Sequence, residues 1–264
     1  MQNYLISEAI GDIAGSAYEG KTRRIKDYNK VKMFSSRAHF TDDTVLTFAC
    51  AEAFIDGLDM TMNLWKCANE HRHAGFSSKF KLWMSSHKPQ PYRSLGNGSA
   101  MRCSSAGWLA KSEKDCIRMA TETAAPTHNH PEGIKGAQCI ALCTWYLANH
   151  RNMEEAKNMA DDICKGMYGS EYARNLIKPG VRDETCQGCV PLAVHIFVKS
   201  KTFEDAIRLA VSYGGDCDTL GAIVGSLAGA FYEIPMDIRD WALSHLPHDM
   251  LRVYKDFERR FCFR

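Results

Sequence analysis

The 264-residue sequence has little that marks a secreted, membrane-spanning or nucleic-acid-binding protein. Its 33 Lys and Arg residues nearly balance 31 Asp and Glu residues, and no basic block stands out, which disfavours a nucleic-acid partner. No apolar run approaches the ~20 residues that cross a bilayer. Residues 1–15 lack the basic start and apolar core of a secretory signal. We therefore expect a cytoplasmic protein with no membrane partner.

Disulfide and zinc scaffolds are also disfavoured, although the chain has 11 cysteines. That density is too low for a disulfide-stapled domain, and most of the cysteines have apolar neighbours, as Cys50 and Cys139 do. Cys186 and Cys189 have the spacing of a zinc-binding pair, but no second pair of ligands matches them. We interpret the cysteines as small buried side chains, with Cys186 and Cys189 on one helix.

Strand-like alternation is scarce, and helical periodicity dominates the chain instead. Apolar residues recur at helical spacing in 5–17 and 45–54, and capping residues at 41–43 open the second stretch. The same pattern predicts helices over 116–123, 132–148, 153–167, 190–198, 203–213, 218–232 and 238–261, the last interrupted at Pro247. The loosest stretch, 75–98, is of a length that is usually functional when it is not helical. Because no linker or repeat divides the chain, we predict a compact all-α fold of one domain, residues 1–264.

Two acidic motifs open predicted helices and are the most informative feature of the sequence. They are Thr41-Asp42-Asp43-Thr44 and Gly214-Gly215-Asp216-Cys217-Asp218-Thr219. Either motif alone is explained by helix capping, since acidic side chains satisfy free N–H groups and the helix dipole there. Together they offer four aspartates, whose oxygens are ligands that Mg²⁺ and Mn²⁺ prefer. Four aspartates that converged without a cation would repel each other, so the pair of motifs suggests a metal centre.

Three further motifs accompany the acidic ones. In Gly11-Asp12…Gly15…Glu19, glycines four residues apart share one helix face and permit close packing, and Glu19 follows near the helix end. Gly96-Asn97-Gly98-Ser99 precedes a helical run and suits a phosphate group, although it lacks the lysine of a Walker motif and, taken alone, is better explained as an ordinary turn and N-cap. Thr127-His128-Asn129-His130-Pro131 opens another helix, and we expect one of its histidines to line a pocket and the other to be exposed.

In this order, the five motifs resemble those of the ADP-ribosylglycohydrolase family, which includes the dinitrogenase-reductase-activating glycohydrolases and the eukaryotic ADP-ribosylhydrolases. The resemblance also takes in Thr185-Cys186-Gln187-Gly188-Cys189-Val190-Pro191, and it runs from the N-terminus to about Pro235. It implies an all-α fold with two divalent cations, Mg²⁺ or Mn²⁺, at the base of a cleft. The implied substrates are ADP-ribosylated proteins or small-molecule ADP-ribose conjugates, and the implied state is a monomer.

The resemblance also implies roles for individual residues. The cation ligands would be Thr41, Asp42, Asp43, Asp216, Asp218 and Thr219, with Asp218 bridging the ions. The contacts to the substrate would come from Ser94, Gly96, Asn97, Gly98, Ser99, Met101 and His128. Glu19 would lie near the cations and help position or activate groups there, and our own hypothesis for the general base is Asp42 or Glu19. Some relatives have an aromatic residue in place of Leu95, so Tyr92 is the candidate for the adenine contact here.

The implied activity is metal-dependent hydrolysis of the glycosidic bond between ADP-ribose and an acceptor, which reverses ADP-ribosylation. Cleavage at a ribose passes through an oxocarbenium-like state and needs a positioned water and a carboxylate, and paired cations can orient the ribose diol. We take arginine on a protein as the first acceptor, with serine-linked ADP-ribose, O-acetyl-ADP-ribose and an ADP-ribosylated base as alternatives. Loops 75–91 and 168–184 are expected to choose among them.

A non-catalytic ADP-ribose-binding protein is the alternative from another functional class. Inactive relatives tend to lose the carboxylates that would hold metal, whereas all four aspartates and both threonines are present here. We therefore favour the enzyme over the binding protein. An activity assay on ADP-ribose conjugates distinguishes the two hypotheses.

Overall fold

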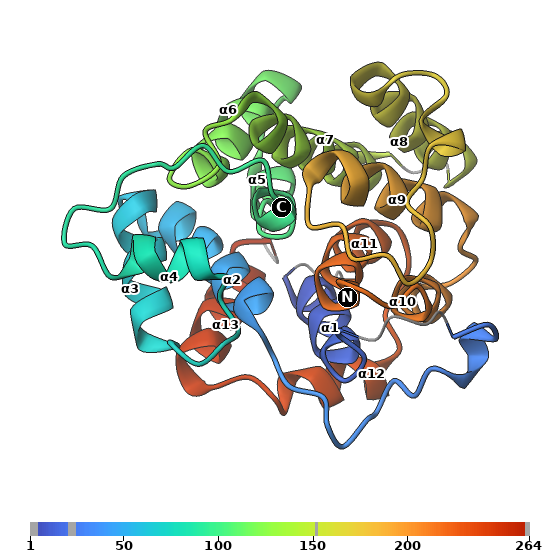
Figure 1. Cartoon of the computed structure of the whole chain (residues 1–264), viewed down its shortest axis with the longest axis horizontal. Coiled ribbons are helices and arrows are strands. Elements are labelled where there is room, and N and C mark those ends of the chain that lie inside the picture. The colour runs from blue at the N-terminus through green and yellow to red at the C-terminus, as the bar shows by residue number, and fades with distance from the viewer. Residues whose placement is uncertain (1–4, 21–24, 151–152, 262–264) are drawn as a thin grey trace.

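Helices form the framework of the computed structural model, which describes residues 5–20, 25–150 and 153–261 (Figure 1). Within these ranges there are 13 α-helices and three short 3₁₀ helices, and no β-strand. The prediction of an all-α fold is therefore confirmed. The α-helices are α1 (Ile6–Ser16), α2 (Asp42–Asp56), α3 (Met60–Glu70), α4 (Ser78–Met84), α5 (Ser104–Leu109), α6 (Glu113–Ala124), α7 (Pro131–Asn149), α8 (Met153–Tyr168), α9 (Cys186–Lys199), α10 (Phe203–Ser212), α11 (Cys217–Phe231), α12 (Met236–Leu243) and α13 (His248–Phe261).

Each helix that periodicity predicts is present, with its ends shifted by a few residues. The interruption at Pro247 separates α12 from α13, which begins at the next residue. The ten cysteines within the described ranges are all free, and nine of them are buried. Cys186 and Cys189 share α9, as expected, and no third metal ligand groups with them in the part of the chain that the structure describes.

The sequence prediction misses α3 and α4, and α4 lies inside the stretch 75–98 that was expected to be loose. Both helices have side-chain N-caps, because Asp59 accepts from the N–H of Met62 and Ser77 accepts from the N–H of Phe80. Each buries only three side chains, in α4 Phe80, Trp83 and Met84. So short an apolar face leaves too weak a periodic signal for detection from sequence.

Glycines bring α1 and α11 into backbone contact. A Cβ atom added at Gly11 would lie 1.9 Å from the carbonyl oxygen of Gly221, and one added at Gly15 would lie 2.4 Å from the Cα atom of Asp218. Real Cβ atoms do not approach other heavy atoms so closely, so only glycine fits at these positions. The close packing predicted from Gly11 and Gly15 is therefore confirmed, and it sets Asp218 directly against α1.

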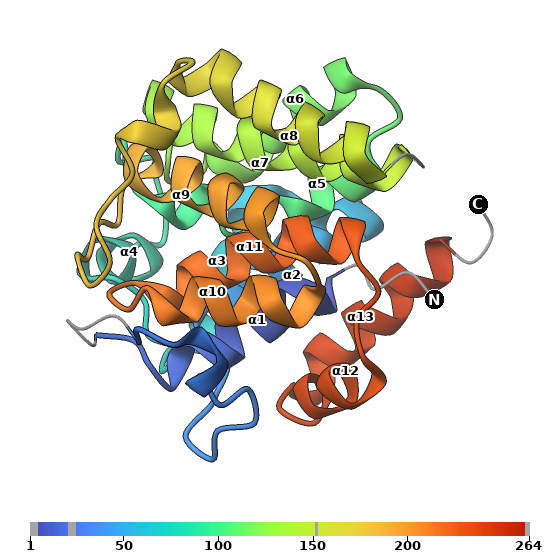
Figure 2. The same ribbon diagram turned by 90° about the vertical axis from the view of Figure 1, so that its right-hand side faces the viewer.

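Helix α11 occupies the centre of the fold (Figures 1 and 2). It contacts α1, α7, α9 and α10, while α6 and α8 pack on α7. Helix α2 contacts α1 and α11 and carries α3, α5 and α13. Because α2 and α11 both begin beside α1, the two acidic motifs at their N-terminal ends lie together.

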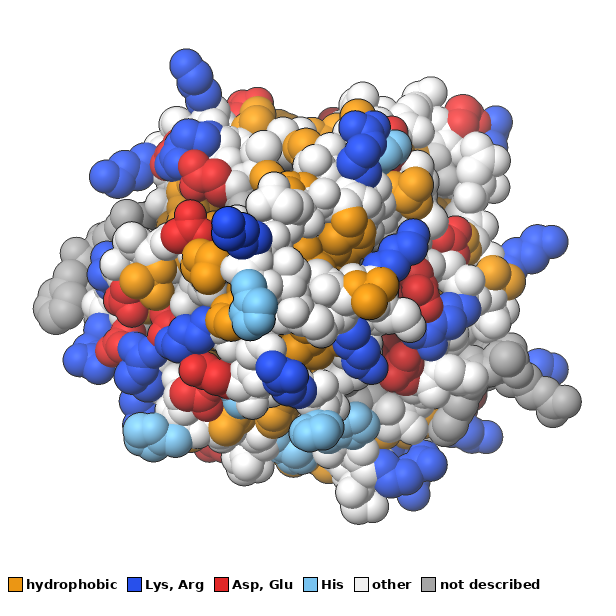
Figure 3. Space-filling model, turned by 60° about the vertical axis from the view of Figure 1, so that its left-hand side comes forward, with side chains coloured by type: hydrophobic (Ala, Val, Ile, Leu, Met, Phe, Trp, Pro, Cys, Tyr) orange, Lys and Arg blue, Asp and Glu red, His pale blue; other side chains and the backbone are white. Residues whose placement is uncertain are grey.

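One face of the molecule has the mixed surface that the neutral composition predicts. On the face shown in Figure 3, basic, acidic, histidine and hydrophobic side chains alternate without one kind dominating. Among the described helices, none is both long enough and apolar enough to cross a membrane.

Candidate active site

The predicted site residues surround one large cavity of about 700 Å³. Its volume is in the range of sites that bind small molecules. The start of α2, segment 92–98, segment 182–185 and the start of α11 contribute to its wall. The predicted site residues that line it are Glu19, Thr41, Asp42, Asp43, Ser94, Gly96, Asn97, Gly98, Met101, His128, Asp216, Asp218 and Thr219. Tyr92, the candidate for the adenine contact, also lines it.

Asp12 of α1 positions the start of α2 through hydrogen bonds. Its carboxylate is fully buried and accepts bonds from the N–H and the hydroxyl of Thr41, both at 2.8 Å. It also accepts from the N–H of Thr44 at 3.1 Å and from the Thr44 hydroxyl at 2.5 Å. Thr41 is in turn the N-cap of α2, with its hydroxyl accepting from the N–H of Asp43. These contacts fix the direction in which Asp42 and Asp43 leave the helix.

The second acidic motif begins on a tight turn, as its two glycines predict. Gly214 and Gly215 both have φ of 70°, in the left-handed region that favours glycine, and α11 starts two residues later. The side-chain amide of Asn97 donates to the Asp216 carboxylate at 2.6 Å. The Thr219 hydroxyl donates to the Asp43 carboxylate at 3.3 Å. The last bond connects the first turn of α11 directly to the first turn of α2.

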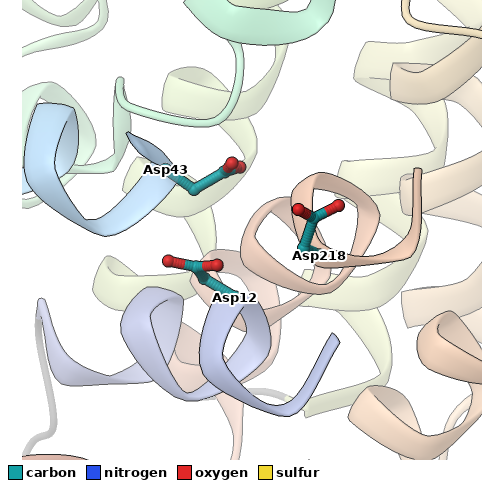
Figure 4. Close-up of side chains that lie close together, drawn as sticks. All are labelled: Asp12, Asp43 and Asp218. Carbon is teal, nitrogen blue, oxygen red and sulfur yellow. The ribbon is translucent and has the colours of Figure 1, made fainter. Parts of the chain in front are cut away.

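Three carboxylates, one each from α1, α2 and α11, converge where the first turns of α2 and α11 meet α1 (Figure 4). Asp12, Asp43 and Asp218 each offer an oxygen within 4.8 Å of the others, and all three side chains are buried. One oxygen of Asp43 and one of Asp218 have no hydrogen-bond partner. Among the ion pairs of the described residues, none joins these three carboxylates to a basic side chain. Buried, unpaired charge of this kind is costly unless a cation balances it.

The pKa values of the cluster show the same imbalance. Burial and, next, the nearby Asp12 carboxylate raise the pKa of Asp43 well above its usual value and that of Asp42 to about 7. Burial and then repulsion by Asp216 raise the pKa of Asp218 well above its usual value. Burial raises the pKa of Asp216 to about 6, although the bond from Asn97 opposes the rise. These residues therefore fit a divalent cation with oxygen ligands, which would meet the unpaired oxygens and favour the ionised carboxylates.

A second group of carboxylates lies toward the cavity mouth. Glu19, Asp216 and Asp218 offer oxygens within 4.8 Å of one another, so Asp218 belongs to both groups. A shared carboxylate is what the expected bridging role of Asp218 requires. Glu19 lies in the turn after α1 and forms an ion pair with Arg182 at 3.0 Å, and Arg182 also reaches Asp216 at 3.4 Å.

The glycine-rich segment forms another part of the wall, next to His128. A Cβ atom added at Gly98 would lie 3.2 Å from the His128 ring, so this approach favours glycine. Two of the amides that were expected to face a phosphate are used within the protein, because Asn97 donates to the Glu184 carbonyl at 2.7 Å and Gly96 to the Ser94 hydroxyl at 3.1 Å. Ser99 does not line the cavity, and its hydroxyl donates to the Gly133 carbonyl at 2.7 Å.

Arg102 is linked to His128 through the hydroxyl of Thr127. The Arg102 guanidinium is fully buried and donates to the Thr123 carbonyl and, at 2.8 Å, to the Thr127 hydroxyl, which bonds the Nδ1 atom of His128 at 2.6 Å. Burial and then the Arg102 charge lower the pKa of His128 well below its usual value, so the ring is neutral at pH 7. His130 is half-buried and not exposed as expected, because its ring nitrogen accepts the N–H of Glu132 and caps α7.

Sequence reasoning assigned no role to three residues that build the site: Asp12, Arg102 and Arg182. A signal for Asp12 was present, because Glu8 and Asp12 are acidic residues four apart in a helix that is apolar on every side. Such a pair is buried only with partners, and Asp12 finds four hydrogen bonds. No comparable signal marks Arg182, whose partner Glu19 is 163 residues away in the chain.

The chain is similar to proteins named as ADP-ribosyl hydrolases and glycohydrolases. It is 28% identical over 171 residues to the ADP-ribosyl-[dinitrogen reductase] glycohydrolase of Rhodospirillum rubrum, a match that covers 62% of this chain and 54% of the relative, little more than half of that protein's length. It is 24% identical to the ADP-ribosylarginine hydrolase Tri1 of Serratia proteamaculans, over 86% of this chain and 70% of the relative. It is 25% identical to the mouse (Mus musculus) ADP-ribosylhydrolase ARH3, over 78% of this chain and 73% of the relative.

The fold has a close counterpart among solved structures. A structure described as an ADP-ribosylglycohydrolase-related protein complex superposes with a TM-score of 0.77 and 21% identity, covering 98% of this chain and 96% of that one. The sequence profile of the ADP-ribosylglycohydrolase family matches residues 2–260. The protein with this acidic cavity therefore belongs to the ADP-ribosylglycohydrolase family of hydrolases.

Proposed function

We propose that this protein hydrolyses the glycosidic bond between ADP-ribose and an acceptor, with arginine on a protein as the first acceptor, and that it needs two divalent cations, Mg²⁺ or Mn²⁺. The observation that carries the proposal is the pair of carboxylate groups that share Asp218, a residue that lines the cavity. Asp12, Asp43 and Asp218 are buried, and Asp43 and Asp218 each keep an oxygen without a partner. Membership of the ADP-ribosylglycohydrolase family supports ADP-ribosyl conjugates as the substrate class.

The residues divide into three tasks. Asp42, Asp43, Asp216, Asp218, Thr41 and Thr219 would hold the cations, and Asp12 keeps Thr41 in position through its two hydrogen bonds. When bound, the cations supply positive charge that orients the ribose diol and lowers the pKa of a bound water. Segment 94–98, Met101 and neutral His128 would contact the rest of ADP-ribose.

Proton transfer in this proposal falls to Asp42 or Glu19, which both line the cavity. The attacking water must lose a proton as it bonds to the anomeric carbon, and a carboxylate nearby stabilises the oxocarbenium-like state. Asp42 is fixed at the start of α2, whereas Glu19 lies in a turn and is exposed. The variants Asp42→Asn and Glu19→Gln separate the two by their pH–rate profiles, since loss of the base removes the acidic limb.

A substrate panel tests the proposed activity. Arginine-linked, serine-linked and O-acetyl-ADP-ribose are each incubated with Mg²⁺, with Mn²⁺ and with a chelator, and release of ADP-ribose is measured. We expect release from the arginine-linked substrate with a cation and loss of release with the chelator. Undiminished release in chelator would refute the metal requirement. Tight binding of ADP-ribose with no release from any substrate would instead identify a binding protein.

A further inference from the structure

One guanidinium group sits among three carboxylates at the mouth of the cavity. Arg182 contacts Glu19 at 3.0 Å, Asp216 at 3.4 Å and Glu184 through its Nε atom. All four residues line the cavity. The three partners come from the turn after α1, the segment before α9 and the start of α11, so distant parts of the chain meet at the Arg182 guanidinium.

The backbone on both sides of Arg182 is fixed, so its position does not depend on the ion pairs alone. The N–H of Gly180 donates to the Tyr213 carbonyl at 2.7 Å. The carbonyl of Glu184 accepts from the N–H of Asn97 at 2.7 Å, and the Asp183 carboxylate accepts from the N–H and hydroxyl of Thr185. These bonds present Glu184 and Arg182 toward the mouth, next to the glycine-rich segment.

The position of this guanidinium relates to the bond that the proposed reaction breaks. Glu19 and Asp216, two partners of Arg182, also form the second carboxylate group together with Asp218. In an arginine-linked conjugate, the acceptor guanidinium is bonded directly to the anomeric carbon of the ribose. A ribose held at the carboxylate groups would therefore place the acceptor guanidinium in the region that Arg182 now fills.

We propose that Glu19 and Glu184 form an acceptor subsite for a guanidinium group, and that Arg182 fills this subsite until an arginine-linked substrate displaces it. The inference rests on the proposed function and names the acceptor class. A planar guanidinium with its fork of donors suits two carboxylates better than a hydroxyl or an acetyl group does. Arg182 is thus an internal competitor, and it raises the apparent KM for arginine-linked substrates by the reciprocal of the fraction of time that the subsite is open.

The proposal predicts opposite effects for two variants. Arg182→Gln removes the competitor and should raise the ratio of kcat/KM for arginine-linked over serine-linked substrate about tenfold, equivalent to about 1.4 kcal/mol. Glu184→Gln removes half of the subsite and should lower the same ratio by a similar factor. The ratio cancels any effect on the shared chemistry of the two substrates. A merely structural role for the ion pairs would shift the ratio in one direction for both variants, or leave it unchanged.

Arg174→Gln is the matched control. Arg174, like Arg182, precedes α9 in the sequence. It forms an exposed ion pair with Glu171 and does not line the cavity. The control makes the same change in net charge as Arg182→Gln, and because it lies outside the cavity it should leave the ratio as in the unaltered protein. Circular dichroism spectra establish that all three variants fold.

Binding of agmatine to the metal-free protein tests the subsite without any turnover. Calorimetry should show tighter agmatine binding to Arg182→Gln than to the unaltered protein, and weaker binding to Glu184→Gln. Equal agmatine affinity in both variants would overturn the proposal. If no ADP-ribose conjugate is hydrolysed, the proposed function fails, while the agmatine measurement still decides whether a guanidinium subsite exists.

Discussion

Replacing Gly11 with alanine perturbs the contact that assembles the acidic cluster. A Cβ atom at this position would lie 1.9 Å from the carbonyl oxygen of Gly221, and both groups belong to helix backbones. No side-chain rotation relieves the overlap, so α1 and α11 must separate by about 1.5 Å to reach an ordinary contact. Because Asp12 follows Gly11 directly and Asp218 is in the first turn of α11, the same movement pulls two carboxylates of the cluster apart.

The expected cost follows from two opposing effects. Forced overpacking in a rigid interior costs about 1–3 kcal/mol or more. Alanine gains up to ~1 kcal/mol over glycine inside a helix. Because the overlap is between two backbones, the cost lies at the upper end of that range. The net loss in free energy of unfolding is then about 2 kcal/mol, which lowers Tm by roughly 4–8 °C in a protein of this size. The displaced carboxylates should also weaken Mn²⁺ binding by at least about tenfold, since metal sites depend on correct ligand positions.

Thermal unfolding with and without Mn²⁺ measures both effects in one series. Gly166→Ala is the control, because Gly166 is an exposed glycine of α8 and a Cβ atom there would meet nothing within 4 Å. It should stabilise the protein by up to ~1 kcal/mol and leave the rise in Tm with Mn²⁺ unchanged. The reasoning would be refuted if Gly11→Ala matched the unaltered protein in both Tm and Mn²⁺ midpoint.

Three further outcomes are expected. Asp218→Asn removes a buried charge with an unpaired oxygen, so it should raise the Tm of the metal-free protein. The same variant should abolish turnover and the rise in Tm that Mn²⁺ causes. An unchanged rise in Tm with Mn²⁺ would exclude Asp218 as a ligand. Arg93→Gly relieves a φ of 52° and should stabilise the protein by about 0.5–1 kcal/mol, after the entropy of glycine is subtracted; urea unfolding that shows a loss would contradict the strain. The raised pKa values of Asp42, to about 7, and Asp216, to about 6, mean that the metal-free fold binds more protons than the unfolded chain. Its stability should fall as pH rises through these values. Mn²⁺ binds the deprotonated carboxylates, so the rise in Tm that Mn²⁺ causes should grow from pH 5.5 to 7.5; a constant rise would contradict these shifts.

The positions of the acidic motifs were predictable because they follow local rules. Thr41 and the acidic residues after it are strong signals for a helix start, and the structure begins α2 there. Gly11 and Gly15 indicated a close helix contact, although their spacing did not name the partner. That partner, α11, is two hundred residues away, and only the three-dimensional fold brings its first turn to α1.

The contacts that complete the site were beyond the reach of the sequence pattern. Asp12 lies in an apolar helix, and its role depends on four bonds to residues of another helix start. Arg182 is in a segment with no periodic pattern, so nothing local places it opposite Glu19. The first turn of α2 was therefore predictable in detail, whereas the identity of its partners required the packing of α1 and α11.

The most direct test of the account is a crystal structure of the protein with Mn²⁺ and ADP-ribose, with anomalous data collected at the manganese edge. The account predicts two anomalous peaks beside Asp218, one toward Asp43 and the other toward Asp216, with the ribose hydroxyls facing both. An anomalous map with no peak among these carboxylates, or with ADP-ribose bound and its ribose away from them, would contradict it.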